Sequence, residues 1–236
     1  MNDQRIARGM AAQKALRSAR LQAGDSSLGW KIGFGTAAAM DKLGIQFPLV
    51  GFLSGAALMP SNTALPLEAF TRAAAEPEIA VHMGSDLGPD ADEHTVRAAI
   101  AGLGPAIEVA DLSFPPDDVE RILAGNIYQR GVILGTMDAS RAGARLDGLA
   151  ARVFKDGAGL AQITDVEANI GRIVGLIRGL ATCLSGLGLK LSAGEVVICG
   201  SIVPPVFIEL PCAITYELES FDALAVRFTR GKAHQP

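Results

Sequence analysis

The eight residues EPEIAVHM, which start at Glu76, constrain most strongly what this chain can fold into. Apolar side chains recur at every second position from Ile79, a period that predicts a β-strand. Glu76 and Glu78 then share the opposite face with His82, and two carboxylates about 6.6 Å apart along a strand can converge on one cation. Pro77 has no N–H to donate to a neighbouring strand, so it predicts an edge or a bulge here. A lone pair of this kind more often marks the solvated face of a strand, so a third acidic residue is needed to indicate a metal site.

Length and composition limit the class of protein. The 236 residues are 49% hydrophobic, which predicts a globular chain that forms a single domain over residues 1–236. A net charge of −4 gives no reason to expect nucleic acid or a membrane surface as a partner, so we expect a small molecule. The first 24 residues contain no apolar run, which predicts a cytoplasmic protein without a signal peptide or spanning helix. The three cysteines form no C-x-x-C pair and are expected to be reduced.

A lysine lies within a glycine-rich strand near the N-terminus. In the sequence LGWKIGFGT from Leu28, alternation places Trp30 and Ile32 on one face and Lys31 on the other, between glycines. The glycines leave room above the ammonium for a ligand, and desolvation there would lower the pKa of the amine and make it a usable acid or base. A packed stem with the ammonium in water explains the local pattern equally well.

A third carboxylate occurs in a stretch that is too apolar for a solvated strand. Residues 106–112, AIEVADL, predict another strand, in which Glu108 lies on the face opposite Ile107 and Val109. An isolated buried charge is expensive, so Glu108 needs a partner. The available partners are Lys31 and a metal ion shared with the two glutamates of the first strand.

Helices are expected around these strands. The pattern predicts a helix over residues 4–22 within an N-terminal segment 1–24, and another from the acidic capping sequence at 90–93 to Leu103. Thr164 and Glu167 form a capping box that predicts the start of a long helix. Together with the strands, these elements predict a β-rich α+β fold.

Four motifs occur in a recognisable order: GWKIG from Gly29, EPEIA from Glu76, PAIEVAD from Pro105 and LSAGEVVICGS from Leu191. Their sequence resembles the 2-keto-4-pentenoate hydratase and 4-oxalocrotonate decarboxylase branch of the fumarylacetoacetate hydrolase superfamily. The resemblance implies a rolled mixed β-sheet core with peripheral helices, and a homo-oligomer.

The resemblance also implies a set of site residues. It assigns Mg²⁺ or Mn²⁺ to three carboxylates, those of Glu76, Glu78 and Glu108. It assigns catalysis to Lys31, and it implies four substrate-binding positions: Gly33, Thr36, Asn126 and Ser201. Three carboxylates and open positions are also what a small hard cation prefers on chemical grounds alone.

The implied activity is that of a divalent-metal-dependent lyase, 2-keto-4-pentenoate hydratase-like, on short unsaturated 2-oxo or 2-hydroxy acids in aromatic-compound catabolism. One departure concerns Leu49, where hydratases of this branch usually have an aspartate. Since decarboxylation depends less on that acid than addition of water does, a 4-oxalocrotonate-type decarboxylase is the first alternative. An acylpyruvate-type C–C hydrolase, for which only His82 could help to activate water, and a non-catalytic metal-binding relative are the others.

Overall fold

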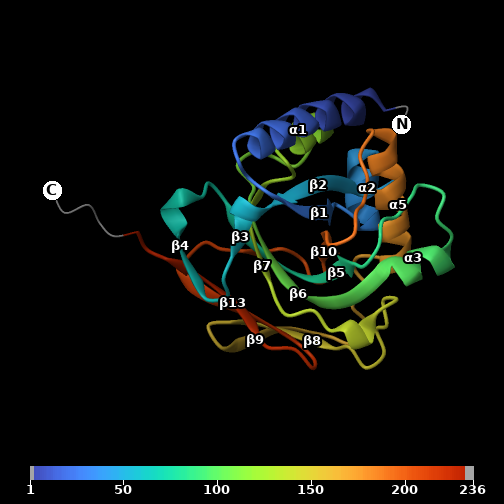
Figure 1. Ribbon diagram of the computed structural model, residues 1–236. Helices are drawn as coiled ribbons and strands as arrows, with labels where there is room; N and C mark the ends of the chain where they lie inside the picture. Colours follow the sequence, from blue (N-terminus) through green and yellow to red (C-terminus); the bar gives the residue numbers. More distant parts are fainter. Residues whose placement is uncertain (1–2, 232–236) are drawn as a thin grey trace.

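Two β-sheets form the framework of the structure, a computed structural model that describes residues 3–231 (Figure 1). The larger, eight-stranded sheet contains, in spatial order, β2 (Leu49–Ser54), β1 (Ser27–Gly33), β10 (Val196–Ser201), β5 (Ala73–Met83), β6 (Ile100–Asp111), β7 (Gln129–Leu134) and β3 (Leu58–Met59), while β11 (Val206–Phe207) pairs with β5. The smaller sheet has the order β4 (Thr63–Pro66), β13 (Leu224–Thr229), β12 (Cys212–Leu218), β8 (Ala151–Lys155) and β9 (Ala158–Ile163).

The larger sheet is mixed and curls on itself (Figure 1). Strand β1 runs parallel to β10 and antiparallel to β2, whereas β10, β5, β6 and β7 follow one another in antiparallel pairs. The smaller sheet packs against β6 through β12 and β13. The expected β-rich α+β fold with a rolled mixed sheet is therefore confirmed, and the single-domain organisation of residues 1–236 stays a prediction.

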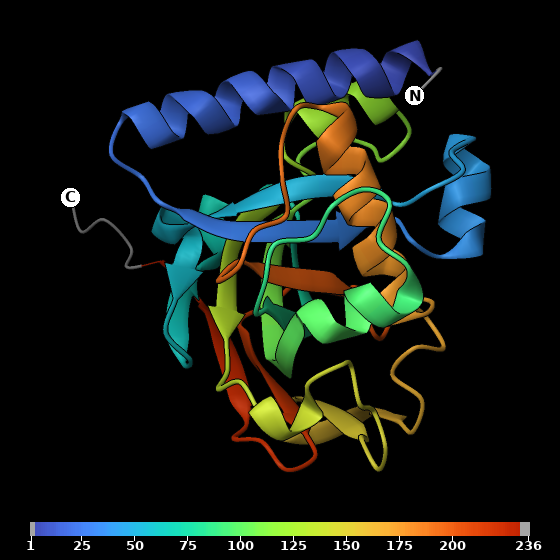
Figure 2. The same cartoon turned by 45° about the vertical axis from the view of Figure 1, so that its right-hand side comes forward.

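Helices cover the outside of the larger sheet (Figure 2). The α-helices are α1 (Gln4–Gln22), α2 (Ala37–Leu43), α3 (Glu93–Ala99), α4 (Val119–Ala124) and α5 (Ile173–Gly186), and short 3₁₀ turns occupy Gly55–Ala57, Leu67–Ala69 and Ala139–Arg141. Helix α1 lies across β1 and β2 and packs on α4, while α3 and α5 lie side by side. Within residues 3–231, no helix has the length and hydropathy needed to cross a bilayer.

Strand β5 contains the predicted strand and extends it back to Ala73. It lies between β10 and β6, so the predicted edge position for Pro77 is wrong. The alternative, an irregularity in the ladder, is present in the neighbouring strand, because the register of β10 against β5 shifts between Ile198 and Ser201. The carbonyl oxygen of Pro77 still accepts a hydrogen bond, from the N–H of Ile202 at 2.9 Å.

Two predicted helix boundaries are wrong. Helix α3 begins as expected with Asp92 as its N-cap, but it ends at Ala99, and the chain continues directly into β6 instead of remaining helical to Leu103. The residues from Ile100 are apolar enough for either structure. Pairing with the long strand β5 selects the strand, since β6 pairs with β5 from Ile100 to Asp111.

The second error concerns the start of α5, which begins at Ile173 and not at Thr164. Gly171 has a φ of +85°, which interrupts any helix that would run through it. The side chain of Glu167 nevertheless caps the helix, because its Oε1 accepts the N–H of Ile173 at 2.7 Å. The predicted N-cap, Thr164, is therefore wrong, because the helix starts nine residues later with Arg172 as its N-cap.

Candidate active site

Lys31 is buried on the inner face of β1. Its side chain is only 2% exposed, and its Nζ donates hydrogen bonds to Oε1 of Glu108 and, at 3.0 Å, to the carbonyl oxygen of Ile127. Gly51 of β2 pairs with Lys31 and supplies the space for the stem, because a Cβ there would lie 2.8 Å from Cγ of the lysine. The interpretation that places the ammonium of Lys31 in water is therefore excluded. Gly51 makes room for the lysine, a role that the sequence analysis did not identify.

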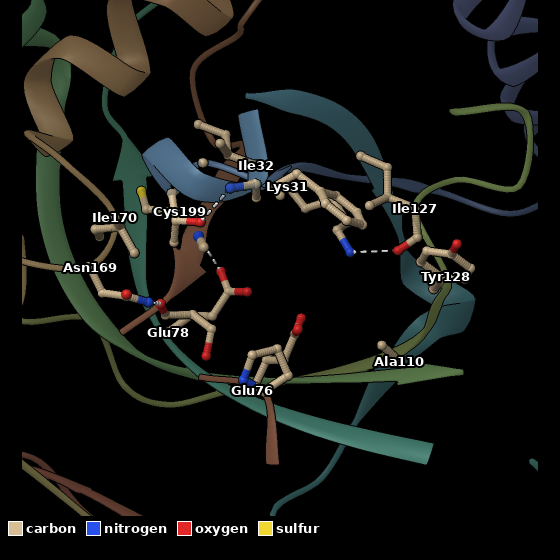
Figure 3. A pocket seen from close by; sticks show the side chains of 18 of the residues that line it. Lys31, Ile32, Glu76, Glu78, Ala110, Ile127, Tyr128, Asn169, Ile170 and Cys199 are labelled. Atoms are coloured by element: carbon tan, nitrogen blue, oxygen red, sulfur yellow. Dashed lines mark hydrogen bonds between the residues drawn. The ribbon is translucent and has the colours of Figure 1, made fainter. Parts of the chain in front are cut away.

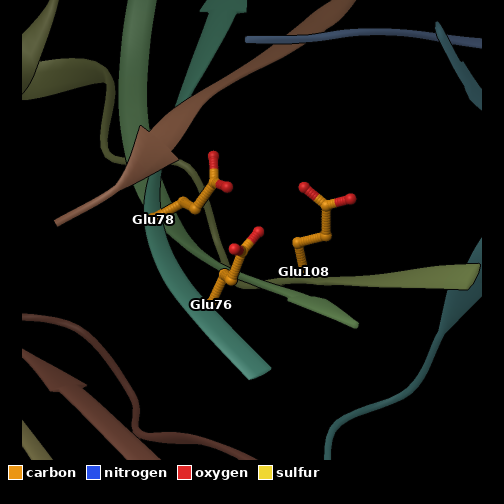
Figure 4. A group of neighbouring side chains, drawn as sticks. All are labelled: Glu76, Glu78 and Glu108. Atoms are coloured by element: carbon orange, nitrogen blue, oxygen red, sulfur yellow. The ribbon is translucent and has the colours of Figure 1, made fainter. Parts of the chain in front are cut away.

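The three glutamates converge from two adjacent strands. Glu76 and Glu78 come from β5, and Glu108 comes from β6 directly opposite Glu76. One carboxylate oxygen from each residue lies within 4.8 Å of the other two, and Figure 4 shows the carboxylates turned toward a common space. Because residues i and i+2 of a strand point to the same side, the period seen in the sequence produces this arrangement directly.

Burial makes ionisation of these acids unfavourable. It raises the pKa of Glu78 well above its usual range, and the nearby carboxylates of Glu108 and Glu76 raise it further. Burial also raises the pKa of Glu76, and it raises that of Glu108 to about 7 despite the opposing effect of Lys31. Such a cluster is stable in its ionised form only with a compensating positive charge.

The donor set fits a divalent cation. Three carboxylates against one ammonium leave two uncompensated negative charges, which equal the charge of one such ion. Oε2 of Glu108 is buried and has no hydrogen-bond partner among the described residues, so it is free to bind a metal. Glu78 is held in place because its Oε2 accepts the N–H of Gly200 at 2.7 Å. The three carboxylates offer oxygen atoms, which small hard cations prefer.

A cavity of about 330 Å³ opens above this cluster (Figure 3). Lys31, Glu76 and Glu78 lie in its wall. The rest of the lining is predominantly apolar and includes Phe34, Leu112, Ile127, Tyr128, Val203 and Phe207. A site of this composition suits a small anionic group held at the charged cluster and an apolar remainder.

The four predicted substrate-binding positions fall into two groups. Gly33, Thr36 and Ser201 line the cavity. Asn126 is buried but is not part of the lining, and its carboxamide instead binds the backbone of Phe52. Asn126 therefore contacts strand β2, next to the strand that contains Lys31, and does not contact the cavity.

Several lining residues had no signal in the sequence. Tyr128 is one, and its hydroxyl donates to the carbonyl oxygens of Phe114 and Pro115, each at 3.2 Å. Burial raises the pKa of Tyr128 to about 12, so the phenol stays protonated at neutral pH. Cys199 also lines the cavity, and burial raises the pKa of its thiol well above the usual range, so it is an unreactive thiol. All three cysteines are free, as expected.

His82 and Leu49, on which the hydrolase and decarboxylase alternatives depend, do not line the cavity. His82 shares a strand face with Glu78 but lies four residues further, about 13 Å along β5. Burial lowers its pKa, so it stays neutral, and it is not part of the lining. Leu49 is buried and pairs with Gly33, and it too is absent from the lining.

Comparison with known proteins supports a common ancestry. No protein-family model matches the chain. A 2-hydroxyhexa-2,4-dienoate hydratase from Comamonas testosteroni is 26% identical over 217 residues, which cover 89% of this chain and 81% of that protein. A 4-oxalocrotonate decarboxylase from Pseudomonas putida is 25% identical over 219 residues, which cover 92% and 83% of the two chains.

Solved structures agree on the fold. The 4-oxalocrotonate decarboxylase from Pseudomonas putida G7, complexed with magnesium and adipate, superposes with a TM-score of 0.86 at 24% identity over 95% of this chain and 86% of that one. Fumarylpyruvate hydrolase from Pseudomonas aeruginosa, in complex with Mn²⁺ and pyruvate, gives a TM-score of 0.67 at 15% identity over 86% and 89%. The fold is that of the fumarylacetoacetate hydrolase superfamily. The resemblance to its hydratase and decarboxylase branch, predicted from four short motifs, is confirmed.

Proposed function

We propose that the protein is a divalent-metal-dependent lyase, 2-keto-4-pentenoate hydratase-like, that acts on short unsaturated 2-oxo or 2-hydroxy acids in aromatic-compound catabolism. One observation carries the proposal: Lys31 and three glutamates form one cluster, and three of these residues lie in the wall of a predominantly apolar cavity. The hydratase and decarboxylase relatives support the reaction type. We further propose a homo-oligomeric, cytoplasmic enzyme.

Glu76, Glu78 and Glu108 are the proposed ligands of Mg²⁺ or Mn²⁺. Two neighbours of the same fold support this choice, since one is complexed with magnesium and the other with Mn²⁺. When bound, such a cation acts as a Lewis acid that stabilises negative charge developing on the oxygen of a 2-oxo group.

Lys31 is the proposed proton-transfer residue. Its ammonium has three N–H donors, of which two bind Glu108 and Ile127, and the third is left for a substrate. Because the side chain is held by β1 and by both acceptors, its amine is fixed before the substrate arrives. Lys31 can donate a proton to the carbon chain as the dienol becomes a ketone, and the proton that the enol hydroxyl loses restores the ammonium.

The cavity favours a substrate with a single carboxylate. Among the described residues that line it, Lys31 is the one basic side chain, and it is already paired with Glu108. A second carboxylate at the far end of a substrate would lose its hydration without gaining a cationic partner. This supports the hydratase-like reading over that of a decarboxylase acting on a dicarboxylate such as 4-oxalocrotonate.

A 4-oxalocrotonate-type decarboxylase is the second candidate, and Leu49 favours it. No acidic side chain from this position can assist the addition of water. Loss of CO₂ requires mainly an electron sink and a proton donor, which the glutamate cluster and Lys31 would provide.

The deciding experiment is an assay of the purified protein with Mg²⁺ or Mn²⁺ on 2-hydroxypenta-2,4-dienoate and, separately, on 4-oxalocrotonate, with products identified by mass. We expect addition of one water to the dienoate. Loss of CO₂ from oxalocrotonate would instead establish the decarboxylase, and absence of turnover with both substrates would contradict the proposed function.

A matched pair of ligands tests the preference for one carboxylate without turnover. 2-Oxoglutarate and 5-methyl-2-oxohexanoate have the same number of non-hydrogen atoms, and only the first carries a distal carboxylate. In the presence of Mg²⁺ we expect calorimetry to show that 5-methyl-2-oxohexanoate binds at least about tenfold more tightly, because its end group is apolar. Equal affinities would exclude this discrimination.

A further inference from the structure

The structure assigns Asn126 a role as a positioning residue for Lys31, an inference that rests on the proposed function of that lysine. The connection between the two residues is a turn of unusual backbone conformation. Asn126, Ile127 and Tyr128 have φ angles of +55°, +53° and +60°, three left-handed residues in succession, none of which is glycine. Left-handed backbone is unfavourable for residues with a Cβ, and for β-branched isoleucine in particular.

The side chain of Asn126 fastens this turn to the sheet. Strand β2 lies at the end of the larger sheet, so one of its edges has no neighbouring strand. At that edge the carboxamide accepts the N–H of Phe52 at 2.8 Å and donates to its carbonyl oxygen at 2.9 Å. The same Nδ2 also donates to Oε1 of Gln129 at 3.2 Å. The carboxamide thus replaces the peptide group of a missing strand, and at 2% exposure it is shielded from competing water.

The turn presents its backbone to the catalytic lysine. The Ile127 carbonyl oxygen accepts a hydrogen bond from Lys31 Nζ at 3.0 Å, and Figure 3 shows this contact on the cavity side. Glu108 is the other acceptor of the ammonium, and it is also a proposed metal ligand. Without the Ile127 carbonyl, the amine would be held by the glutamate alone and could move toward the carboxylate cluster.

Close packing around the turn fixes the Asn126 carboxamide relative to the stem of Lys31. A Cβ on Gly51 would lie 2.8 Å from Cγ of Lys31 and 2.9 Å from Oδ1 of Asn126. The lysine stem, the glycine and the carboxamide are therefore packed against one another. The buried Asn126 has no contact with the cavity, so its effect on the reaction passes through Ile127 and Lys31.

The test compares two buried carboxamides that bind the same edge strand. Gln13 donates to the carbonyl oxygens of Val50 at 3.0 Å and Leu123 at 2.9 Å, and like Asn126 it is 2% exposed. The variants are Asn126→Ala, Asn126→Gly and Gln13→Ala. Glycine accepts a left-handed φ without strain, so Asn126→Gly removes the carboxamide while it keeps the backbone conformation accessible.

We expect both Asn126 variants to lower kcat about 100-fold, because a small displacement of a reacting group has an effect of this order. KM and the affinity for Mg²⁺ should stay within about threefold of the wild-type values, since Asn126 neither lines the cavity nor belongs to the glutamate cluster. Gln13→Ala should lower the midpoint of urea unfolding and leave kcat unchanged. A wild-type kcat in the Asn126 variants, or an equal loss in Gln13→Ala, would overturn the inference.

Hydrogen exchange measured by mass spectrometry on the metal-free proteins separates this inference from the proposed function. Amides 126–129 should exchange faster in Asn126→Ala than in the wild type, whatever reaction the protein catalyses. Unchanged exchange would overturn the inference that the carboxamide of Asn126 holds the turn against β2. If the variant exchanges faster as expected but the wild type shows no turnover, the proposed function fails and the role of the carboxamide stands.

Discussion

The inner face of the larger sheet and the buried face of the smaller sheet are equally dry but chemically different. The former buries Lys31, Glu78 and Glu108 at 2% exposure or less. The latter buries apolar side chains such as Ile214 and Val226, each 0% exposed. Burial of apolar groups stabilises a fold, whereas burial of charges costs stability unless they are compensated. The difference teaches that substitutions at the charged cluster test reactivity, whereas substitutions in the smaller sheet test stability.

The largest expected effect is on catalysis. Lys31→Met keeps the approximate size of the side chain and removes its charge. We expect kcat to fall about 10²- to 10⁴-fold, the range for loss of a general acid–base group. Initial rates with saturating Mg²⁺ measure it, with circular dichroism as the control for folding. A variant that keeps its turnover would remove Lys31 from the mechanism.

The smaller sheet should show the opposite behaviour. Ile214→Ala deletes a completely buried side chain and should lower the free energy of unfolding by about 2–5 kcal/mol, because a cavity remains. Urea unfolding measures the loss, and Ile214→Val serves as the milder control. The rate per folded molecule should not change, and a reduced rate would show that the two regions are coupled.

Metal binding should stabilise the protein more strongly as the pH rises. The folded-state pKa of Glu108, about 7, lies above its ordinary value of 4.5, so its protonated form stabilises the metal-free fold and that contribution is lost as the pH rises through 7. At pH 8 a cation at 100 times its dissociation constant adds about 2.7 kcal/mol.

Thermal unfolding with and without Mg²⁺ at pH 6 and pH 8 measures this difference. The rise in Tm should be larger at pH 8, and Glu108→Gln should reduce both the rise and its dependence on pH. An equal rise at both pH values in the wild type would contradict the assignment of the buried carboxylates as ligands.

The smallest expected effect is a gain in the stability of the metal-free protein when one carboxylate of the site is replaced. Glu78→Gln replaces a buried carboxyl group, whose ionised form is unfavourable beside Glu76 and Glu108, but keeps an oxygen that can accept the Gly200 N–H. The metal-free variant should be more stable than the wild type by about 1 kcal/mol, although its affinity for Mg²⁺ falls. Chemical unfolding and calorimetry measure the two quantities. Loss of stability in the absence of metal would show that Glu78 also supports the fold.

The strands and the acidic cluster could be predicted because they depend on short-range patterns. Alternation at period two places Glu76 and Glu78 on one face, and an apolar context marks Glu108 as buried. The structure brings these residues together with Lys31. Their roles as ligands and proton-transfer residue remain predictions that the variants above examine.

The remaining features depend on distant partners. Nothing near residue 100 in the sequence says that helix α3 must end there, because the pairing of β6 with β5 decides it. Gly51 and the left-handed turn at Asn126 likewise follow from the position of Lys31 in the neighbouring strand. Such features arise from tertiary packing, which overrides local propensity.

The pairing of β1 with β10 has a consequence for how the protein folds. It joins residues 29–31 to residues 196–198 in a parallel ladder, so β1 and β2 are connected to the rest of the larger sheet only through a strand late in the chain. Contacts of such long sequence separation form slowly, since a large loop must be ordered first. During synthesis β2 is available to β1 early, but its other neighbour, β10, emerges only after more than 190 residues. Gly200, whose N–H binds and orients Glu78, belongs to the same strand, β10. The capacity to bind metal should consequently appear in the last phase of refolding, and its time course would report completion of the native structure.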